Sequence, residues 1–422
     1  MTWNPLTDIL FILLAYWLYR TFLEPYPRFV LEEPIDLDDP NAMERIAAVA
    51  DAAVSRGNSI EVLRDGEAFY PAILDAMRAA QRSINIEVFT FRQGRIANEF
   101  AEVLCERAHA GVRVRLLPDG FGAARMAIQR GLLNRLRKAG CEVRFYHPPS
   151  LLHLELLNTR THREIFVIDG EVAFTGGAGV ADQWMTRTRR GGPRWRDTMF
   201  RIRGPAAAAL QGIFVENWMA ASGTILTGRR EFPEIPPAGS QSCAVINSYA
   251  RSGASDARIV HHVLLGSAKR KITIASPYFL PDPSVCEQLE TAAARGVEVM
   301  VVTTGKKTDH ALTRAGSRRL YGRLLAAGVR IYEYQRSMYH VKVLAVDDRW
   351  VVFGTANFDN RSLAIDDQVC VVADESAIVV RLQEDLRRDL KHSREITLEE
   401  WKRRPLLERV HAQLSRMLER QQ

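Results

Sequence analysis

Apolar and polar positions along the chain follow two alternating periods, one near 3.6 residues and one of two residues. The helix–strand pairs predicted for the first part are 68–82 with 83–91, 96–110 with 111–117, and 132–139 with 141–146. The pairs predicted for the second part are 257–269 with 271–279, 285–295 with 297–303, and 320–327 with 329–334. Strands that alternate with helices predict an α/β fold, with a mostly parallel sheet flanked by helices in each part.

The two parts correspond to each other along the sequence. The matched pairs are Gly111 with Gly296, Gly140 with Gly328 and His162 with His340, at separations of 185, 188 and 178 residues. A separation this steady indicates internal duplication. We therefore expect two similar halves related by a pseudo-twofold axis, with ligands at the carboxyl ends of the parallel strands.

Shifts in composition divide the chain into six expected segments. They are a hydrophobic membrane-anchor segment (1–31), a linker with a lead-in helix (32–60), the first half (61–224), a connector (225–245), the second half (246–392) and a basic amphipathic C-terminal helix (393–422). The last segment fits either a helix packed on the body or a helix that lies on a membrane surface.

The N-terminal segment is continuously apolar over residues 9–19, and its tryptophan and tyrosine side chains suit a membrane interface. It lacks a basic leader region and a small-residue cleavage site, which disfavours a cleaved signal peptide. A single span, an in-plane anchor and a buried helix all fit this pattern. Arg20 and Arg28 follow the apolar run, which favours an inner- or plasma-membrane protein with its body in the cytoplasm.

Overall charge and cysteine usage narrow the classes of function. The chain of 422 residues has a formal net charge of +7, which favours polyanionic partners such as an anionic lipid surface or nucleic acid. Its five cysteines are scattered and include no C-x-x-C pair. They fit reduced, partly buried side chains and disfavour a disulfide framework.

Residues 339–362 combine side chains that suit attack on a phosphodiester. The alternation predicts a strand with His340 and Lys342 on one face, then a turn and a return strand that ends near Asn357. An imidazole attacks phosphorus or shuttles a proton, while an ammonium and an amide stabilise charge on the non-bridging oxygens. A solvent-facing strand with an incidental histidine and lysine is the alternative for that pair taken alone.

The longer spacing resembles the motif of the phospholipase D superfamily, H-x-K-x4-D-x6-G-x2-N. Its fixed positions are matched here by His340, Lys342, Asp347, Gly354 and Asn357. The chain looks most like the bacterial cardiolipin synthases, because it contains S-P-Y-F-L-P at 276–281 and G-T-A-N-F-D-x-R-S at 354–362. This resemblance implies transfer of a phosphatidyl group from one phospholipid to a glycerol-type hydroxyl on another, which yields cardiolipin.

The duplication predicts a second copy of the motif in the first half. That copy spans residues 161–179 and contains His162, Asp169 and Gly176 at the same spacing. Two positions depart from the motif, with Glu164 in place of lysine and Gly179 in place of asparagine. Arg160 shares the predicted strand face with His162, so it is a candidate for the missing cation. A decayed copy kept for its fold is the alternative.

The resemblance implies two in-line displacements through a phosphohistidine. The first-half histidine often serves as nucleophile in the family, which is His162 here, and His340 is then the acid and base. Glu164 leaves the reverse assignment open. The expected catalytic set is His162, Asp169, His340, Lys342 and Asp347, and the expected substrate-binding set is Asn357, Arg160 and Ser362.

In the family, an acidic side chain downstream of each motif orients the histidine of its own half. Asp197 fits this position in the first half. In the second half Gln368 occupies the usual glutamate position, so Asp366 or Asp367 is expected to take over. With Glu164, these acids form the expected supporting set.

This chemistry requires no metal ion or cofactor, and no carboxylate cluster or cysteine–histidine spacing demands one. The expected partners are anionic phospholipid substrates and the membrane. The N-terminal segment disfavours nucleic acid as a partner, and the oligomeric state stays open. Two other functions remain open: another phosphodiesterase of the superfamily, either lipid hydrolase or nuclease, and a catalytically degenerate lipid-binding protein.

Overall fold

The structure is a computed structural model. It describes residues 28–124, 126, 130–149, 158–185, 193–249, 255–406, 408, 409 and 412, with positions 8, 11, 12, 15, 16 and 19 before them. Most of the expected N-terminal anchor and most of the expected C-terminal helix therefore lie outside the described residues. Within the described part of the chain, no helix is both long and apolar enough to cross a bilayer.

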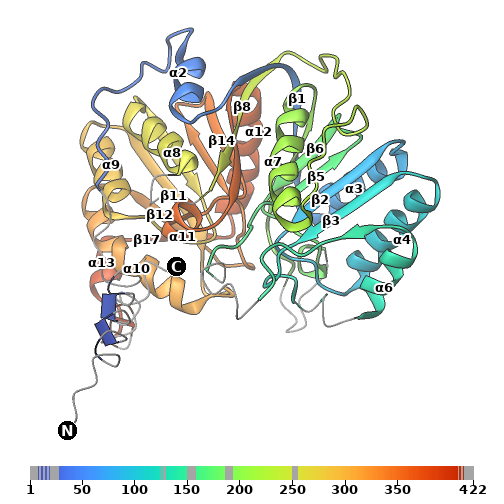
Figure 1. Cartoon of the computed structure of the whole chain (residues 1–422). Helices are drawn as coiled ribbons and strands as arrows, with labels where there is room; N and C mark the ends of the chain where they lie inside the picture. The colour runs from blue at the N-terminus through green and yellow to red at the C-terminus, as the bar shows by residue number, and fades with distance from the viewer. Residues whose placement is uncertain are drawn as a thin grey trace.

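A single sheet of fifteen described strands runs through both halves (Figure 1). From the centre outward, the first half contributes β1 (Val54–Arg64), β7 (Thr198–Arg203), β6 (Val172–Gly176), β5 (Ile165–Ile168), β2 (Ser83–Val88), β3 (Arg113–Pro118) and β4 (Glu142–Val143). The second half contributes β8 (Gln241–Ser248), β16 (Gln368–Asp374), β14 (Trp350–Gly354), β13 (Val343–Val346), β9 (Lys271–Ala275), β11 (Glu298–Thr304), β12 (Arg330–Tyr334) and β17 (Ser393–Ile396). Apart from β17, strands that occupy equivalent places along the chain occupy equivalent places in the sheet. The structure therefore shows the internal duplication predicted from the sequence.

The expectation of a mostly parallel sheet in each half is wrong. Within this fifteen-stranded sheet, β2, β3 and β4 run parallel, as do β9, β11 and β12, and the other pairings are antiparallel. The reason is that β5–β6 and β13–β14 are tight hairpins, and a tight turn can join only antiparallel strands. The halves also share one sheet, because β1 and β8 pair antiparallel at the centre.

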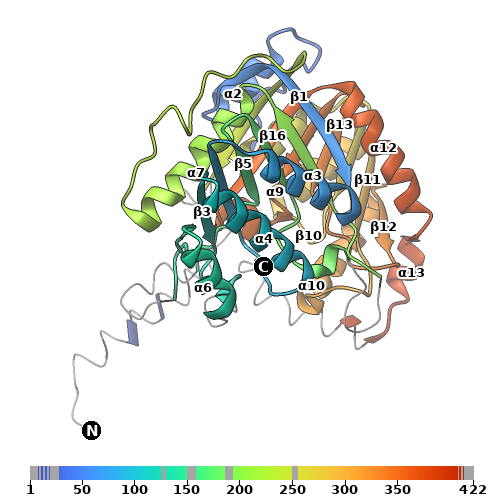
Figure 2. The same ribbon diagram turned by 90° about the vertical axis from the view of Figure 1, so that its right-hand side faces the viewer.

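Helices cover both faces of the sheet. They are α2 (Ala42–Val49), α3 (Gly66–Ala79), α4 (Arg95–His109), α6 (Arg130–Lys138), α7 (Ala206–Ser222), α8 (Asp256–Ser267), α9 (Pro283–Ala294), α10 (Ala311–Ala326), α11 (Asn360–Ala364), α12 (Ser376–Leu390) and α13 (Leu398–Lys402). Helices α3, α4 and α6 bury their apolar faces on the first half (Figure 2), and α2, α8, α9 and α10 do so on the second. The six helices predicted from periodicity are all present; five have ends shifted by one to three residues, and α10 begins at Ala311, nine residues before the predicted start at residue 320.

Helices α7 and α12 cover the other face, where one core serves both halves. At its centre the rings of Phe200 and Phe353, one from each half, stack with centroids 3.8 Å apart. Burial of such rings is the main stabilising term in a core of this kind. The shared core holds the two copies in one fixed relation, which places their equivalent ends side by side.

Two smaller features complete the fold. Strands β10 (Phe279–Leu280) and β15 (Phe358–Asp359) form a separate parallel pair in the second half. All five cysteines are buried and free, as their scattered positions predict.

Candidate active site

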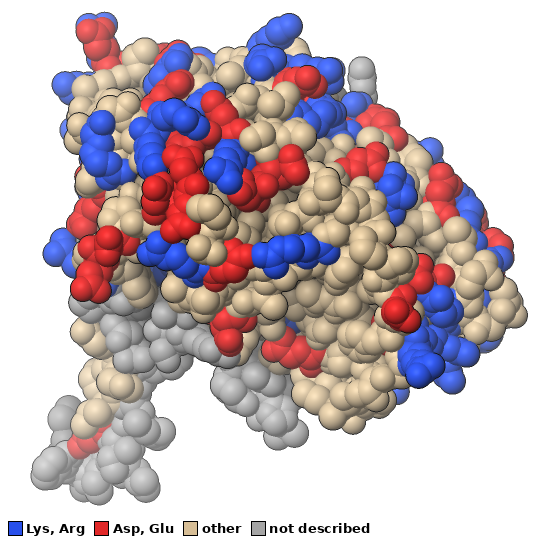
Figure 3. All heavy atoms as spheres, turned by 90° about the horizontal axis from the view of Figure 1, so that it is seen from above, with Lys and Arg blue, Asp and Glu red and all other residues tan. Residues whose placement is uncertain are grey.

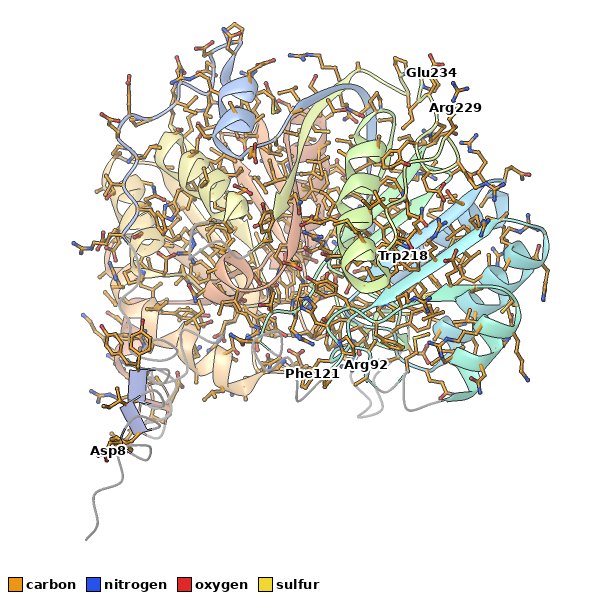
Figure 4. The ribbon with its side chains drawn as sticks, in the orientation of Figure 1. Asp8, Arg92, Phe121, Trp218, Arg229 and Glu234 are labelled. Atoms are coloured by element: carbon orange, nitrogen blue, oxygen red, sulfur yellow. The ribbon has the colours of Figure 1, made fainter. Side chains whose placement is uncertain are left out.

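A cavity of about 490 Å³ opens where β2 and β9 end and β5 and β13 begin. Both halves line it, and His162 and His340 share it. In Figure 4 the labelled lining residues Arg92 and Phe121 mark this end of the molecule, whereas Arg229 and Glu234 mark the opposite end. The other expected site residues that line the cavity are Arg160, Glu164, Lys342, Asn357, Ser362 and Asp366.

Each histidine lies in an extended segment just before a strand rather than within it. β13 begins at Val343 and β5 begins at Ile165, later than the sequence pattern suggested. Backbone hydrogen bonds from the opposite half fix these segments: His340 N–H donates to the Arg196 carbonyl (2.7 Å), and His162 N–H donates to the Asp367 carbonyl (2.9 Å). Pairing across the halves therefore sets the position of both rings.

The carboxylate of Asp197 holds the ring of His340. Its Oδ2 lies 2.7 Å from His340 Nδ1 and accepts a hydrogen bond from Trp184 Nε1 at 2.9 Å. Its Oδ1 accepts from the backbone N–H of Thr198 at 2.8 Å. The ring of Trp195 lies 5.3 Å from that of His340. Because Nδ1 is engaged in this way, Nε2 is the nitrogen of His340 left for a substrate.

The ring of His162 has its own acid and its own aromatic wall. Asp366 Oδ2 lies 3.5 Å from His162 Nε2 and 3.1 Å from Arg361 Nε. The ring of Phe89 contacts the imidazole, with centroids 4.1 Å apart. The His162 side chain remains 25% exposed, so one face of the ring is open to a ligand.

These contacts correct the expected pairing of acids with histidines. Asp197 belongs to the first half and contacts His340 at 2.7 Å, while Asp366 belongs to the second half and lies 3.5 Å from His162. The physical reason is the antiparallel pairing of β1 with β8. This pairing brings the histidine segment of each half next to the acidic segment of the other half.

Asp367, the other candidate in the second half, does not line the cavity. Its carboxylate accepts a hydrogen bond from Tyr146 Oη at 2.7 Å and lies 3.4 Å from Asn217 Nδ2. Both contacts are buried. Asp367 therefore belongs to the polar support behind the cavity, and its backbone carbonyl is what reaches His162.

Burial and neighbouring charges set the protonation of the site. Burial and the charge of Arg361 lower the pKa of His162 to about 3, so its imidazole is neutral at neutral pH. Burial and Lys342 also lower the pKa of His340, but Asp197 opposes them through its charge and its hydrogen bond. Of the two rings, His340 is therefore the better placed to carry a proton.

Polar groups of the second half form one wall of the cavity. Lys342 Nζ lies 3.3 Å from His340 Nε2 and donates to the His340 carbonyl at 3.1 Å. Burial lowers the pKa of this lysine to about 8, so it is mostly charged at pH 7. Asn357 Nδ2 donates to Ser362 Oγ at 3.0 Å, and Asn357 Oδ1 has no partner among the described residues.

Arg160, the expected substitute cation of the first half, is buried beside the cavity. Its Nη1 donates to the His147 carbonyl at 3.0 Å and lies 3.8 Å from Asp119 Oδ1. The guanidinium thus lines the cavity from a fixed position, with part of its charge directed to Asp119. Glu164 lies on the same side, at the position that corresponds to Lys342.

Asp169 and Asp347, which the motif places in the catalytic set, lie at the ends of the strands that point away from the cavity. Asp169 accepts backbone hydrogen bonds from Gln81, Arg82 and Ser83 at 2.6 to 2.8 Å. Asp347 accepts from Lys269, Arg270 and Lys271 at 2.7 to 2.9 Å. Both sit in the left-handed conformation, with φ of 55°. Their spacing in the motif therefore reflects a turn that clamps the start of β2 or β9, not contact with substrate.

Several lining residues escaped the sequence analysis, namely Phe89, Trp184, Trp195, Asp309, Asp359 and Arg361. Tyr278 lies in the S-P-Y-F-L-P segment, and its hydroxyl donates to Asp309 Oδ1 at 2.7 Å. Arg361 lies in the G-T-A-N-F-D-x-R-S segment, so the motif itself held a signal for it. The aromatic residues gave no signal, because an isolated tryptophan in a loop resembles any surface aromatic.

The sequence matches the family model described as "Cardiolipin synthase, PLD-like domain" over residues 73–191 and 262–390. The two matched stretches fall in the two halves of the fold, and each contains one of the cavity histidines. The chain belongs to the phospholipase D-like cardiolipin synthases. The predicted superfamily and the predicted class of enzyme, a phosphatidyltransferase, are therefore confirmed.

Individual relatives agree with this family. The chain is 33% identical over 369 residues to cardiolipin synthase 1 of Bacillus anthracis, covering 85% of this chain and 71% of the relative. It is 31% identical to the major cardiolipin synthase of Bacillus subtilis (strain 168), covering 87% and 76%. Its fold resembles the crystal structure of phosphatidylserine synthase from Haemophilus influenzae Rd KW20, with a TM-score of 0.70 and 13% identity, covering 90% of this chain and all of that chain.

Proposed function

We propose that this cardiolipin synthase-like protein moves a phosphatidyl group between phospholipids through a phosphohistidine on His162. The observation that carries the proposal is the shared cavity, in which a neutral His162 and an acid-paired His340 face one space. The pKa of both rings is lowered, but Asp197 favours the protonated form of His340, whereas burial and neighbouring cations disfavour a proton on His162. Such a difference between two titratable groups is the usual mark of a nucleophile beside an acid.

In the first displacement, a nitrogen lone pair of His162 attacks phosphorus, and the bond from phosphorus to the leaving headgroup oxygen breaks. His340 donates its proton to that oxygen. In the second displacement, His340 takes a proton from the acceptor hydroxyl, whose oxygen attacks phosphorus and releases His162. Asp197 stabilises the charged imidazolium of His340 during both steps.

Fixed cations and an amide surround the position of the phosphate. Lys342, Arg160 and Arg361 bring positive charge to the cavity wall, and Asn357 adds a polar side chain. Donors held in a partly dry cavity stabilise negative oxygens more strongly than water does. The positive charge of these groups also explains why the cavity would bind an anionic phosphodiester in preference to a neutral ester.

We further propose that the mouth of the cavity meets the bilayer. Phe121 of the first half is 69% exposed, and Leu312 of the second half is 42% exposed. Phe121 lines the cavity, and Leu312 lies between the lining residues His310 and Thr313. Apolar side chains of this size enter the acyl boundary of a membrane, and the expected anchor at residues 1–31 would act with them.

The opposite face has a different character. Figure 3 shows Lys and Arg interspersed with Asp and Glu over that side of the molecule. Mixed charge of this kind does not form the continuous basic patch that typically binds nucleic acid. The face opposite the cavity therefore gives no support for nucleic acid as the substrate, and the cavity face favours lipid.

The test is formation of cardiolipin from phosphatidylglycerol alone by the purified full chain in mixed micelles. We expect cardiolipin and free glycerol in equal amounts, and loss of both products in His162→Ala. Release of phosphatidic acid without cardiolipin would show a lipid hydrolase instead. Absence of any phosphodiester turnover, with lipid binding retained, would support a catalytically degenerate lipid-binding protein.

A further inference from the structure

The two copies of the motif bring different groups to the cavity. Glu164 corresponds to Lys342, and Gly179 corresponds to Asn357, at the separation that also relates the two histidines. One side of the cavity therefore has an ammonium and an amide, and the other has a carboxyl group beside a glycine. The proposed mechanism gives roles to Lys342 and Asn357 but none to Glu164 and Gly179.

The two departures form one structural unit. A Cβ atom at position 179 would lie 3.0 Å from Glu164 Oε1 and 2.6 Å from the Thr90 carbonyl oxygen. An asparagine at this position would therefore collide with the backbone and crowd the carboxyl group. Glycine leaves room for the Glu164 side chain, so the two departures from the motif are structurally coupled.

Glu164 is buried but incompletely satisfied. Its exposed fraction is 5%, it lines the cavity, and its Oε2 has no hydrogen-bond partner among the described residues. Buried polar atoms in folded proteins almost always have a partner. An unpartnered oxygen on a side chain that lines the cavity is available to a group that the substrate supplies.

The cations that line the cavity with Glu164, together with the burial of its carboxyl group, limit what that group can be. Burial raises the pKa of this carboxyl well above its usual range and so favours its neutral form, against the charge of Lys342 and the backbone hydrogen bonds from Phe89 and Thr90. A neutral carboxyl both donates and accepts a hydrogen bond, which matches an alcohol. A second anion would be repelled by the charged form. An ammonium group would have to enter beside Lys342 and Arg361, which is unfavourable.

We propose that Glu164 recognises the hydroxyl next to the attacking one on a polyol acceptor, so that it selects glycerol-type acceptors over simple alcohols. This inference rests on the proposed phosphatidyl transfer and assigns a specificity-determining residue to its acceptor. In this assignment Lys342 and Asn357 bind the phosphate, while Glu164, whose side chain occupies the room left by Gly179, binds the acceptor.

The first test is a competition between acceptors. The purified full chain, with phosphatidylglycerol as donor in micelles, receives deuterated glycerol and 1-propanol at equal concentration, and mass spectrometry gives the ratio of the two lipid products. We expect wild type to favour deuterated glycerol about tenfold, Glu164→Gln to keep that ratio within about twofold, and Glu164→Ala to bring it near one. Glutamine is the matched control because it also donates and accepts.

Two results of the competition would overturn the proposal. One is a Glu164→Ala protein that keeps the wild-type product ratio, whatever its overall rate. The other is a wild type that prefers added ethanolamine to both alcohols and loses that preference in Glu164→Gln, because this would show a carboxylate that binds a cation.

A binding measurement separates this inference from the proposed function. Trp184 and Trp195 line the cavity, so their fluorescence reports titration with glycerol phosphate or propyl phosphate. We expect wild type to bind glycerol phosphate about tenfold more tightly, and Glu164→Ala to lose that difference. The same difference without any lipid product would refute the transferase and keep the subsite. Lipid products without any difference in binding or in acceptor ratio would keep the transferase and refute the subsite.

Discussion

Asp197 Oδ2 lies 2.7 Å from His340 Nδ1, although the two residues are 143 positions apart and belong to different halves. The reciprocal contact places Asp366 within 3.5 Å of His162. Each histidine thus takes its acid from the other copy, so neither half contains a complete site. The shared core around Phe200 and Phe353 is what holds the two incomplete halves in register.

The first prediction concerns Asp197. Replacement by asparagine removes the charge that favours protonated His340, so acid catalysis of leaving-group departure should weaken. We expect Asp197→Asn to lower kcat by about 10²-fold or more with natural phospholipids. With a 4-nitrophenyl leaving group, which needs no proton, the first displacement should be far less affected.

Asp366→Asn is the matched control, because Asp366 contacts the proposed nucleophile instead. Its loss should be similar for both leaving groups. Equal losses for natural and 4-nitrophenyl substrates in Asp197→Asn would contradict the assignment of His340 as the acid.

The second prediction concerns the covalent intermediate. His340→Ala, mixed with a 4-nitrophenyl phosphatidyl ester, should release a burst of one nitrophenolate per protein and then stall, because the second displacement lacks its base. Peptide mapping under mild conditions should locate the phosphoryl group on His162. His162→Ala should give no burst. A phosphoryl group on His340 in wild type would instead show that the roles are reversed.

Much of the fold could be predicted from the sequence. The helices around residues 68–82 and 96–110, and the strands that follow them, depend on local periodicity that neighbours in sequence determine. The steady separation of paired glycines and histidines was enough to predict the duplication, and thus the partner of His340. Five cysteines without a pattern sufficed to predict free thiols.

The exchange of acids between halves could not be predicted in this way. Asp197 and His340 meet because β1 pairs with β8 and because the His340 segment binds the backbone of Arg196. These are contacts between segments distant in sequence, and they cannot be inferred from the spacing of residues within a motif. The same limit applies to Trp184, which lines the cavity and donates a hydrogen bond to Asp197.

Asp169 and Asp347 show a different limit. A fixed position in a motif reports that a residue is required, but not whether it serves chemistry or the backbone. Here the carboxylates accept three backbone hydrogen bonds each at the start of β2 and β9. The spacing was correct, and the role inferred from it was not supported.

The third prediction follows from this position. Asp347→Asn replaces a charged acceptor with a weaker one and should lower the free energy of unfolding by about 1.5–3 kcal/mol. Its activity at low temperature, per folded molecule, should stay within about threefold of wild type. Thermal denaturation and initial rates on the same sample measure both. A stable but inactive Asp347→Asn protein would return this residue to the catalytic set.

The fourth prediction concerns pH. Burial lowers the pKa of Lys342 to about 8, so the side chain is charged below pH 8 and loses its charge as the pH rises through that value. Affinity for the anionic phosphodiester should therefore fall on the alkaline side, seen as a decrease in kcat/KM near pH 8. Lys342→Arg should move this decrease upward by more than one pH unit, because guanidinium stays charged. A decrease that remains near pH 8 in that variant would point to Asp366, whose pKa burial raises to about 8.

The last prediction concerns the mouth of the cavity. If Phe121 and Leu312 enter the acyl boundary, the Phe121→Ser/Leu312→Ser double variant loses apolar area that would be buried in the membrane. We expect its apparent KM for phosphatidylglycerol in vesicles to rise about tenfold or more, while its rate on a short-chain, soluble phosphodiester stays near that of wild type. Val380→Ser is the matched control, because Val380 is 51% exposed on α12 and does not line the cavity. Equal effects on vesicle and soluble substrates would show that the two side chains shape the cavity rather than contact lipid.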